Sequence, residues 1–336
     1  MNILAFDIES CTGRPTDGSL CSFGYVFIND GKIVDSGDIL VNPLPKAFTL
    51  GGYGQSPKLK LAYPVSHFRK QPRFDGRYCE IKALFDKADL ALGFSIANDV
   101  KYLNNACDMF SLQRIKYKFL DIQTLATLII KDLKSTGLKA IAERYGVEFL
   151  EHRSDEDARA TYEIFLKLIE EYGKPLSAIV EDFGLIVGEN GENGHTGCYS
   201  KWLVKERLQA ATRSVRRILI NYYNESASRL TPKNSWLSGK TVAMAEAIFL
   251  KDIDLARKIV CSTYACGGIY DSSILKCDVY VTCEEDKMAK RVPRINPRGC
   301  KVITLKEFER GCGEFTDMQF DNFDILEKHY SAFSPD

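Results

Sequence analysis

The stretch MNILAFDIES (residues 1–10) decides the fold class, because an apolar run leads directly into two acids. Such a run predicts a buried strand, with Asp7 and Glu9 at its carboxyl end. Side chains alternate along a strand, so both carboxylates point to the same face of the sheet. Two like charges on one face repel each other unless a cation lies between them. The pair is therefore a candidate metal site, and the alternative is a strand that runs out into a polar loop.

The segments that follow predict a mixed sheet flanked by helices. Residues 21–43 predict a hairpin around the turn Asn29-Asp30-Gly31 and then a third strand that stops at Pro43. Residues 44–78 are rich in Pro, Gly and basic residues and predict a long loop. Strand or helix patterns follow at 79–90, 91–94, 98–107, 119–130 and 138–147, with a last helix that ends near Tyr172. Strands at the front followed by alternating strands and helices are typical of an α/β fold.

The composition is that of a globular protein and excludes several classes of function. The chain has 336 residues, of which 45% are hydrophobic and 27% charged, and its formal net charge is zero. Global attraction to polyanions is therefore absent, and a nucleic-acid surface must be a local patch. The eleven cysteines include no C-x-x-C pair, which argues against a zinc site or a redox dithiol. We expect a cytoplasmic protein with reduced cysteines and no membrane contact, since neither a signal peptide nor a membrane-length apolar stretch is found.

Changes in composition divide the chain into four parts. We expect an α/β domain over residues 1–175 and a small α/β domain over 235–315, followed by a tail over 316–336. Between the domains, residues 176–234 combine a Gly- and Asn-rich linker with a basic helical segment. Residues 201–233 of that segment carry eight Lys or Arg against two Glu. Two roles are open for it: a nucleic-acid arm, or an amphipathic helix that braces the domains.

The stretch LEHRSDEDARATYEIF (150–165) places one histidine shortly before three acids. Ser154 is a plausible N-cap, and acids in a first helical turn are favourable even without a ligand. Helical periodicity separates the acids, because Asp155 and Glu156 fall on polar stripes whereas Asp157 falls at the edge of the apolar face. An inward carboxylate is costly unless something pairs with it, and a metal ion would meet that need.

Asp99 is a fourth acid of the same kind. It begins a helix directly after a short buried strand, and it shares a stripe with apolar side chains. Favourable placement at a helix N-terminus is the simpler explanation for this acid taken alone. Together with Asp7, Glu9 and Asp157, however, it completes a set of four carboxylates. Oxygen-only ligands suit Mg²⁺ or Mn²⁺ rather than zinc, and four carboxylates suit a two-metal site for phosphodiester cleavage.

These motifs resemble those of the DEDDh family of 3′→5′ exonucleases, the group of the epsilon subunit of DNA polymerase III and of ribonuclease T. The resemblance covers roughly residues 1–172 and rests on FDIES (6–10), LGFSIANDVKYLNNAC (92–107) and HRSDEDA (152–158). The second motif departs from the family pattern, which commonly has a His-Asn pair where Phe94-Ser95 stands here.

The resemblance implies a ribonuclease H-like fold and hydrolysis with two Mg²⁺ or Mn²⁺ ions. It implies that Asp7 bridges both ions, that Glu9 and Asp157 complete one site, and that Asp99 supports the other. His152 would act as general base on the attacking water, a role that suits an imidazole near neutral pH.

Two further groups of residues are candidates for binding the nucleic acid. The motifs place three residues close to the acids, namely Ser10, Cys11 and Phe94. The loop at 56–78 interleaves aromatic with basic side chains, and its candidates for phosphate contacts are Lys58, Arg69, Lys70 and Arg73. Aromatic side chains can stack unpaired bases, each contributing roughly 1–3 kcal/mol. A merely solubilising loop is the alternative.

A second resemblance, to BRCT domains, begins after Trp236. It rests on LSGKTVAM (237–244), ACGGIYDSSILKCDVYVTCEEDKMAK (265–290) and GCKVITLKEFERGC (299–312). Members that bind phosphopeptides usually have Ser or Thr at the end of the first strand, where this chain has Ala243, Met244 and Ala245. We therefore expect this domain to dock a protein partner or a DNA end rather than phosphoserine.

The sequence therefore favours a metal-dependent 3′→5′ exonuclease that acts on single-stranded or frayed DNA, with DNA repair among the pathways open to it. The first alternative is an RNA-trimming exoribonuclease of the same family, because only the second domain favours DNA. The second alternative is a catalytically weak scaffold that docks partners, for which the altered surroundings of Asp99 are the best support.

Overall fold

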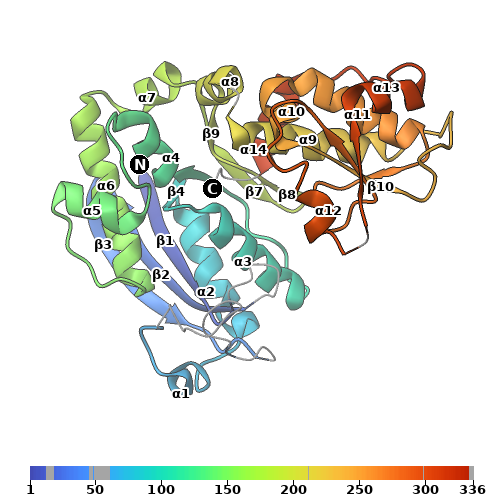
Figure 1. The fold of residues 1–336 in the computed structure, drawn as a ribbon. Helices are drawn as coiled ribbons and strands as arrows, with labels where there is room; N and C mark the ends of the chain where they lie inside the picture. Colours follow the sequence, from blue (N-terminus) through green and yellow to red (C-terminus); the bar gives the residue numbers. More distant parts are fainter. Residues whose placement is uncertain (13–18, 45–47, 49–60, 211, 298, 333–336) are drawn as a thin grey trace. The chain divides into compact units, whose positions relative to one another are not determined.

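The structure is a computed structural model that describes residues 1–12, 19–44, 48, 61–210, 212–297 and 299–332. Its contacts divide the chain into two compact units, Met1–Leu203 with Tyr330–Asp336 and Val204–His329. Figure 1 shows both units, and each is described by itself. Within the described ranges, no helix has both the length and the apolar character needed to cross a membrane.

A mixed sheet of seven strands forms the centre of the first unit (Figure 1). The strand order is β3-β2-β1-β4-β5-β7-β8. The strands are β1 (Asn2–Ser10), β2 (Leu20–Asn29), β3 (Lys32–Leu40), β4 (Leu90–Gly93), β5 (Tyr117–Asp121), β7 (Gly188–Gly191) and β8 (Gly194–Thr196). β1 pairs antiparallel with β2 and parallel with β4, and β4 pairs parallel with β5. The predicted mixed α/β arrangement is confirmed.

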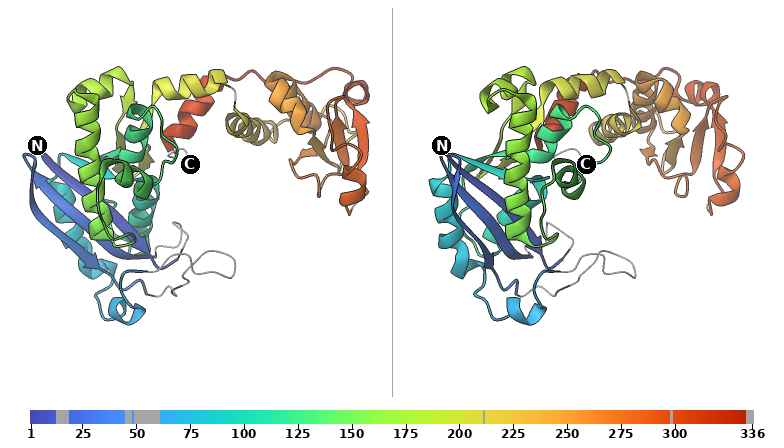
Figure 2. Two further views of the ribbon diagram at one scale, coloured as in Figure 1. Left: turned by 60° about the vertical axis from the view of Figure 1, so that its left-hand side comes forward. Right: turned by 90° about the vertical axis from the view of Figure 1, so that its left-hand side faces the viewer.

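Helices cover both faces of this sheet (Figure 2). α2 (Phe74–Lys87) packs on one face, where the ring centroids of Phe6 and Phe85 lie 5.2 Å apart. α6 (Ser154–Tyr172) crosses the opposite face at Gly24, where a β-carbon would clash with the helix backbone. The other helices of this unit are α1 (Val65–Phe68), α3 (Ala97–Met109), α4 (Ile122–Ile129), α5 (Leu138–Tyr145) and α7 (Leu176–Asp182). β1 is enclosed on both sides, which explains its nearly continuous apolar run.

The hairpin predicted in residues 21–43 is present, with one difference. β2 and β3 flank a turn in which Asp30 and Gly31 both have positive φ. The prediction of a separate third strand is wrong, because β3 continues through Gly37, which stays paired with Tyr25. An isolated glycine weakens a strand without necessarily ending it.

Part of the predicted Gly- and Asn-rich linker belongs to the first unit. Residues 185–200 form β6 (Leu185–Ile186), β7, β8 and β9 (Tyr199–Ser200) rather than an extended connection. β7 and β8 make a hairpin, Gly194 has φ +123°, and β7 extends the sheet beside β5. Glycine and asparagine serve tight turns as well as linkers, so composition alone does not separate the two.

The second unit is built on a four-stranded parallel sheet with the order β11-β10-β12-β13. The strands are β10 (Thr241–Met244), β11 (Ile269–Tyr270), β12 (Val279–Thr282) and β13 (Lys301–Thr304). Its helices include α9 (Arg213–Ala227), α10 (Glu246–Lys251), α11 (Ile253–Ala265), α12 (Val292–Ile295) and α13 (Leu305–Cys312). Together these elements make a small α/β unit.

The basic segment and the expected tail both take part in secondary structure. Residues 201–233 form two helices, α8 (Lys201–Ala210) and α9, instead of the single helix predicted. α9 packs against α11. Beyond β13 and α13, Asp317 accepts a hydrogen bond from the buried Arg257 at 2.8 Å, and α14 spans Asn322–Ala332. The expected tail is therefore anchored, because its acid pairs with a buried guanidinium.

Candidate active site

Three carboxylates meet at the carboxyl end of β1. Asp7 and Glu9 come from β1, and Asp157 comes from the first turn of α6. One carboxylate oxygen from each lies within 4.8 Å of those of the other two. Oxygens at this separation can share a divalent cation. The fold thus brings together acids that lie far apart in the sequence.

The strand register explains this meeting. Asp7 is paired with Gly24 of β2, so both point to the face that α6 crosses. Gly24 has no side chain, and an added β-carbon would lie 1.9 Å from the carbonyl carbon of Ser154. α6 therefore begins directly over the β1–β2 pair, and its inward residue Asp157 lies beside Asp7.

Asp99 lies next to this group, in the first turn of α3 after β4. β4 runs parallel to β1, so the start of α3 and the end of β1 occupy the same edge of the sheet. Asp99 is buried and accepts a hydrogen bond from the backbone amide of Ile8. Burial, and then the charges of Asp7 and Glu9, raise its pKa well above the usual range. All four predicted acids therefore share one neighbourhood, although Asp99 is not among the three closest.

Desolvation and mutual repulsion make these carboxylates hard to ionise together. Desolvation, and then the charge of Glu9, raises the pKa of Asp7 to about 8. For Glu9, desolvation and then the charge of Asp157 raise the pKa to about 8. For Asp157, desolvation and then the charge of Asp7 raise the pKa to about 8. Among the ion pairs of the described residues, only the contact of His152 with Glu9 includes any of the four acids. The group therefore fits a divalent cation, which would offset the repulsion between the carboxylates.

His152 stands in the turn directly before α6. It has φ +64°, a left-handed conformation that is unfavourable for a residue with a β-carbon. Its Nδ1 lies 4.0 Å from Oε1 of Glu9, and 42% of its side chain is exposed. Its backbone amide donates to the carboxylate of Asp157. The imidazole is held beside the carboxylates with one side open to water, as a proton-accepting group requires.

Ser154 is not the N-cap that the sequence predicts. Arg153 occupies that position without a capping side-chain hydrogen bond, and it pairs instead with Asp155 at 2.8 Å. The Ser154 hydroxyl turns toward the sheet, where it lies 2.6 Å from Oγ of Ser22 and donates to Asp38 at 3.2 Å. The capping prediction is wrong because long-range partners compete for this hydroxyl. Ser22 and Asp38 are contacts that sequence reasoning missed.

The residues predicted to bind substrate next to the motifs are largely covered. Cys11 is fully buried, and Phe94 is 9% exposed. Ser10 is less buried, and its hydroxyl donates to the carbonyl of Thr12 at 2.7 Å. A substrate can therefore reach Ser10 more readily than the side chains of Cys11 or Phe94.

The basic residues predicted to contact phosphates follow α1. Arg69 and Lys70 are exposed directly after this helix, whereas Arg73 pairs with Asp75 at 3.3 Å. Lys58 lies outside the described residues. The prediction of a loop is wrong for α1 and for the start of α2, because each of these helices buries an aromatic side chain.

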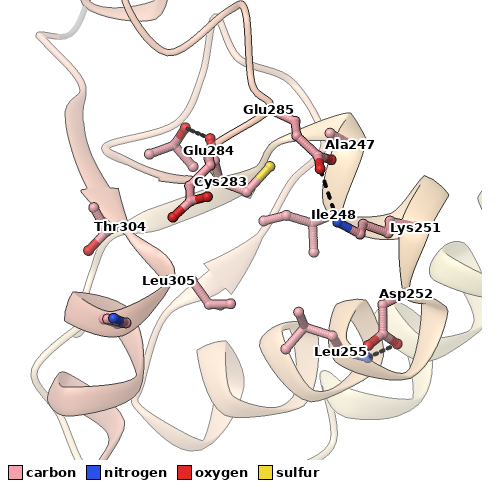
Figure 3. A pocket seen from close by; sticks show the side chains of 12 residues that line it. Ala247, Ile248, Lys251, Asp252, Leu255, Cys283, Glu284, Glu285, Thr304 and Leu305 are labelled. Carbon is pink, nitrogen blue, oxygen red and sulfur yellow. Dashed lines mark hydrogen bonds and ion pairs between the residues drawn. The ribbon is translucent and has the colours of Figure 1, made fainter.

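The second unit has a pocket of about 800 Å³ at the carboxyl ends of β12 and β13 (Figure 3). Its aliphatic lining comes from Ala247, Ile248, Leu255 and Leu305. Three of its charged side chains are engaged in the fold, since Lys251 pairs with Glu285 at 3.0 Å and Asp252 accepts from the amide of Leu255 at 2.9 Å. The pocket therefore combines aliphatic side chains with several charged ones, three of which already have partners.

Parts of this chain are similar to known proteins. A solved structure of exonuclease X in complex with 5′ overhanging duplex DNA is similar at 14% identity, with a TM-score of 0.39 over 54% of this chain and 97% of that one. Two sequence relatives are the PolC-type DNA polymerase III of Caldanaerobacter subterraneus subsp. tengcongensis, 28% identical over 170 residues, and the DNA polymerase III subunit epsilon of Aquifex aeolicus, 32% identical over 84 residues. These matches cover 50% and 25% of this chain, and 11% and 42% of the relatives.

The family match falls on the segment that carries three of the five predicted catalytic residues. Residues 66–165 match the Exonuclease family, and this range includes Asp99, His152 and Asp157. The two relatives are DNA polymerase III proteins, and this chain matches less than half the length of either. The first unit therefore contains an Exonuclease-family domain.

Proposed function

We propose that this chain is a metal-dependent 3′→5′ exonuclease that removes nucleotides from the 3′ end of DNA, single-stranded or frayed. One observation carries the proposal: carboxylate oxygens of Asp7, Glu9 and Asp157 lie within 4.8 Å of one another in a unit with an Exonuclease-family domain. Their raised pKa values show that the group is unfavourable when charged and alone. A bound cation removes that penalty, so the arrangement suits metal-assisted hydrolysis.

We assign two Mg²⁺ or Mn²⁺ ions to the site, since carboxylate oxygens favour these hard cations. Bound there, the ions would activate a water and stabilise charge on the scissile phosphate. Asp7 would hold both ions in this proposal, which is consistent with its charge acting on both Asp157 and Asp99. Glu9 and Asp157 would complete one ion's ligands, and Asp99 would support the other.

His152 is the general base in this proposal. Its exposed imidazole lies beside Glu9, at the mouth of the carboxylate group. A neutral imidazole there can accept the proton of the attacking water as the new bond to phosphorus forms.

DNA is favoured over RNA as the substrate because both sequence relatives named above are DNA polymerase III proteins. In this proposal the exposed Arg69 and Lys70 would neutralise phosphates of the bound strand. RNA trimming uses the same chemistry and is the alternative that a direct assay separates.

Release of nucleotides from 3′-labelled oligonucleotides tests the proposal. The wild type should degrade single-stranded DNA in Mg²⁺ or Mn²⁺, and Asp7→Ala should be inactive. Asp35→Ala is the matched control, because it removes an exposed carboxylate from β3. Matched DNA and RNA oligonucleotides decide the substrate class. Unchanged activity in Asp7→Ala would overturn the assignment, and inactivity of the wild type without a metal-induced rise in melting temperature would favour a scaffold.

We also propose that residues 235–315 form a BRCT-like domain that docks a protein partner. The parallel four-stranded sheet and the apolar pocket support this proposal. Residues 243–245 at the end of β10 are buried and carry no hydroxyl, so we expect no phosphoserine binding. Fluorescence polarisation of phosphoserine peptides with the full chain checks this expectation, and saturable binding would contradict it.

A further inference from the structure

A buried polar contact joins the sheet to the start of α6, and the proposed chemistry does not use it. Ser22 and Ser154 are 2% and 1% exposed, and their hydroxyl oxygens lie 2.6 Å apart. Oδ1 of Asp38 accepts a hydrogen bond from the hydroxyl of Ser22 and lies 3.2 Å from that of Ser154. Because each hydroxyl has one proton, two of the three contacts within this group are hydrogen bonds at any one time. Buried polar atoms are costly unless they are hydrogen-bonded, so each of these three side chains holds the other two in place.

The register of the sheet puts this contact beside the carboxylate group. Asp38 of β3 is paired with Gly24 of β2, and Gly24 is paired with Asp7 of β1. Residues paired across strands share a face, so these three form a row beneath α6. A β-carbon on Gly24 would lie 1.9 Å from the carbonyl carbon of Ser154 and 2.1 Å from the amide nitrogen of Asp155. α6 begins in a gap that only glycine leaves open.

The start of α6 needs such an anchor. Arg153 is its N-cap and provides no capping side-chain hydrogen bond. His152 has a left-handed φ of +64°, a conformation that persists only when neighbouring structure enforces it. Ser154 stands between His152 and Asp157 in the sequence, so a fixed Ser154 restrains the residues on both of its sides.

We propose that Ser22, Gly24 and Asp38, which we call the α6 seat, are positioning residues that hold Ser154. By holding Ser154, they position Asp157 of α6 and His152 of the preceding turn relative to the acids of β1. Asp38 acts through hydrogen bonds and not as a metal ligand. The inference rests on the exonuclease function proposed above and extends it to residues outside the motifs.

Kinetics of three full-length variants test the α6 seat. Asp38→Ala removes the acceptor, Ser154→Ala removes a donor, and Asp38→Asn keeps a carbonyl oxygen of the same reach without the charge. We expect the two alanine variants to lose at least about tenfold in kcat, because misplaced catalytic groups cost rate. KM for a 3′-labelled oligonucleotide should stay within about twofold, and Asp38→Asn should keep most of the wild-type kcat.

The asparagine variant separates positioning from metal binding. If Asp38 were a metal ligand, Asp38→Asn would be as inactive as Asp38→Ala and would need more Mn²⁺ for half-maximal activity, which would overturn the proposal. Asp35→Ala on the same strand serves as the control for a lost carboxylate.

Hydrogen exchange provides a readout that needs no activity. Asp38→Ala and Ser154→Ala should speed exchange at the amides of Glu156 and Asp157, which donate to the carbonyl of Arg153, and Asp38→Asn should not. Unchanged exchange and unchanged kcat in Asp38→Ala would refute the α6 seat. If the wild type lacked nuclease activity, faster exchange in Asp38→Ala would leave the seat standing, and only the proposed function would fail.

Discussion

The acids at the end of β1 and the acids around the pocket of the second unit are stabilised in different ways. Asp7, Glu9 and Asp157 are largely buried against one another, and desolvation raises the pKa of each to about 8. Glu285 at the pocket is exposed and pairs with Lys251. Repelling acids without a cationic partner cost stability that a ligand can restore, whereas a paired surface acid needs no ligand to explain it. The acids at the end of β1 therefore indicate a ligand site, whereas the acid at the pocket indicates only an ordinary surface ion pair.

Asp157→Asn should produce the largest loss of activity and the clearest difference between the carboxylate group and the pocket of the second unit. We expect kcat to fall on the order of 10³-fold, equivalent to about 4 kcal/mol, because the variant lacks a proposed metal ligand. In EDTA above pH 8, where Asp157 is ionised, the same variant should melt at a higher temperature than the wild type, since one repelling charge is gone. Nuclease assays and thermal melts check both results. A lower melting temperature in EDTA would contradict our account of the charges.

Replacement of His152 should affect rate more than stability. His152→Ala should lower kcat by about 10²-fold, as expected for loss of a general base. His152→Gly should lose the same activity, but its free energy of unfolding, measured with urea, should exceed that of His152→Ala by about 1 kcal/mol. The reason is that glycine accepts φ +64° without strain. Equal stability of the two variants would show that the turn is not strained.

The pH dependence of stability should reveal the three acids whose pKa is raised in the folded protein. Their pKa values in the folded protein are near 8, against ordinary values of 3.8 to 4.5, so the folded state keeps protons that the unfolded chain releases. In EDTA this contribution is complete below pH 4 or so and is lost as pH rises toward about 8. Melting curves across this range should show a decline that Asp157→Asn reduces and Mg²⁺ reverses. A decline unaffected by either would have another origin.

Lys251→Ala should have the smallest effect. It removes an exposed partner of Glu285, and surface ion pairs contribute little. The melting temperature and the nuclease activity should both match the wild type within error. A clear loss of activity would show that the pocket influences catalysis and would weaken the contrast between the two regions.

The site shows where sequence reasoning succeeds and where it stops. Periodicity within α6 predicted that Asp157 faces the core, and its burial confirms this. The prediction succeeds because the pattern depends only on neighbours one turn away. The capping prediction for Ser154 failed because its partners, Ser22 and Asp38, come from distant strands. Alternation along β3 could have placed Asp38 on one face, but nothing in its spacing points to α6.

Local patterns in the sequence determined the buried β1, the hairpin, the inward edge of α6 and the order of the four acids. The tertiary structure decided that Gly24 lies beneath Ser154, that Asp99 reaches the end of β1, and that residues 185–200 form strands instead of a linker. The physical reason is range. Periodicity and turn chemistry act within a few residues, whereas strand register and helix packing depend on partners that only the folded chain brings into contact.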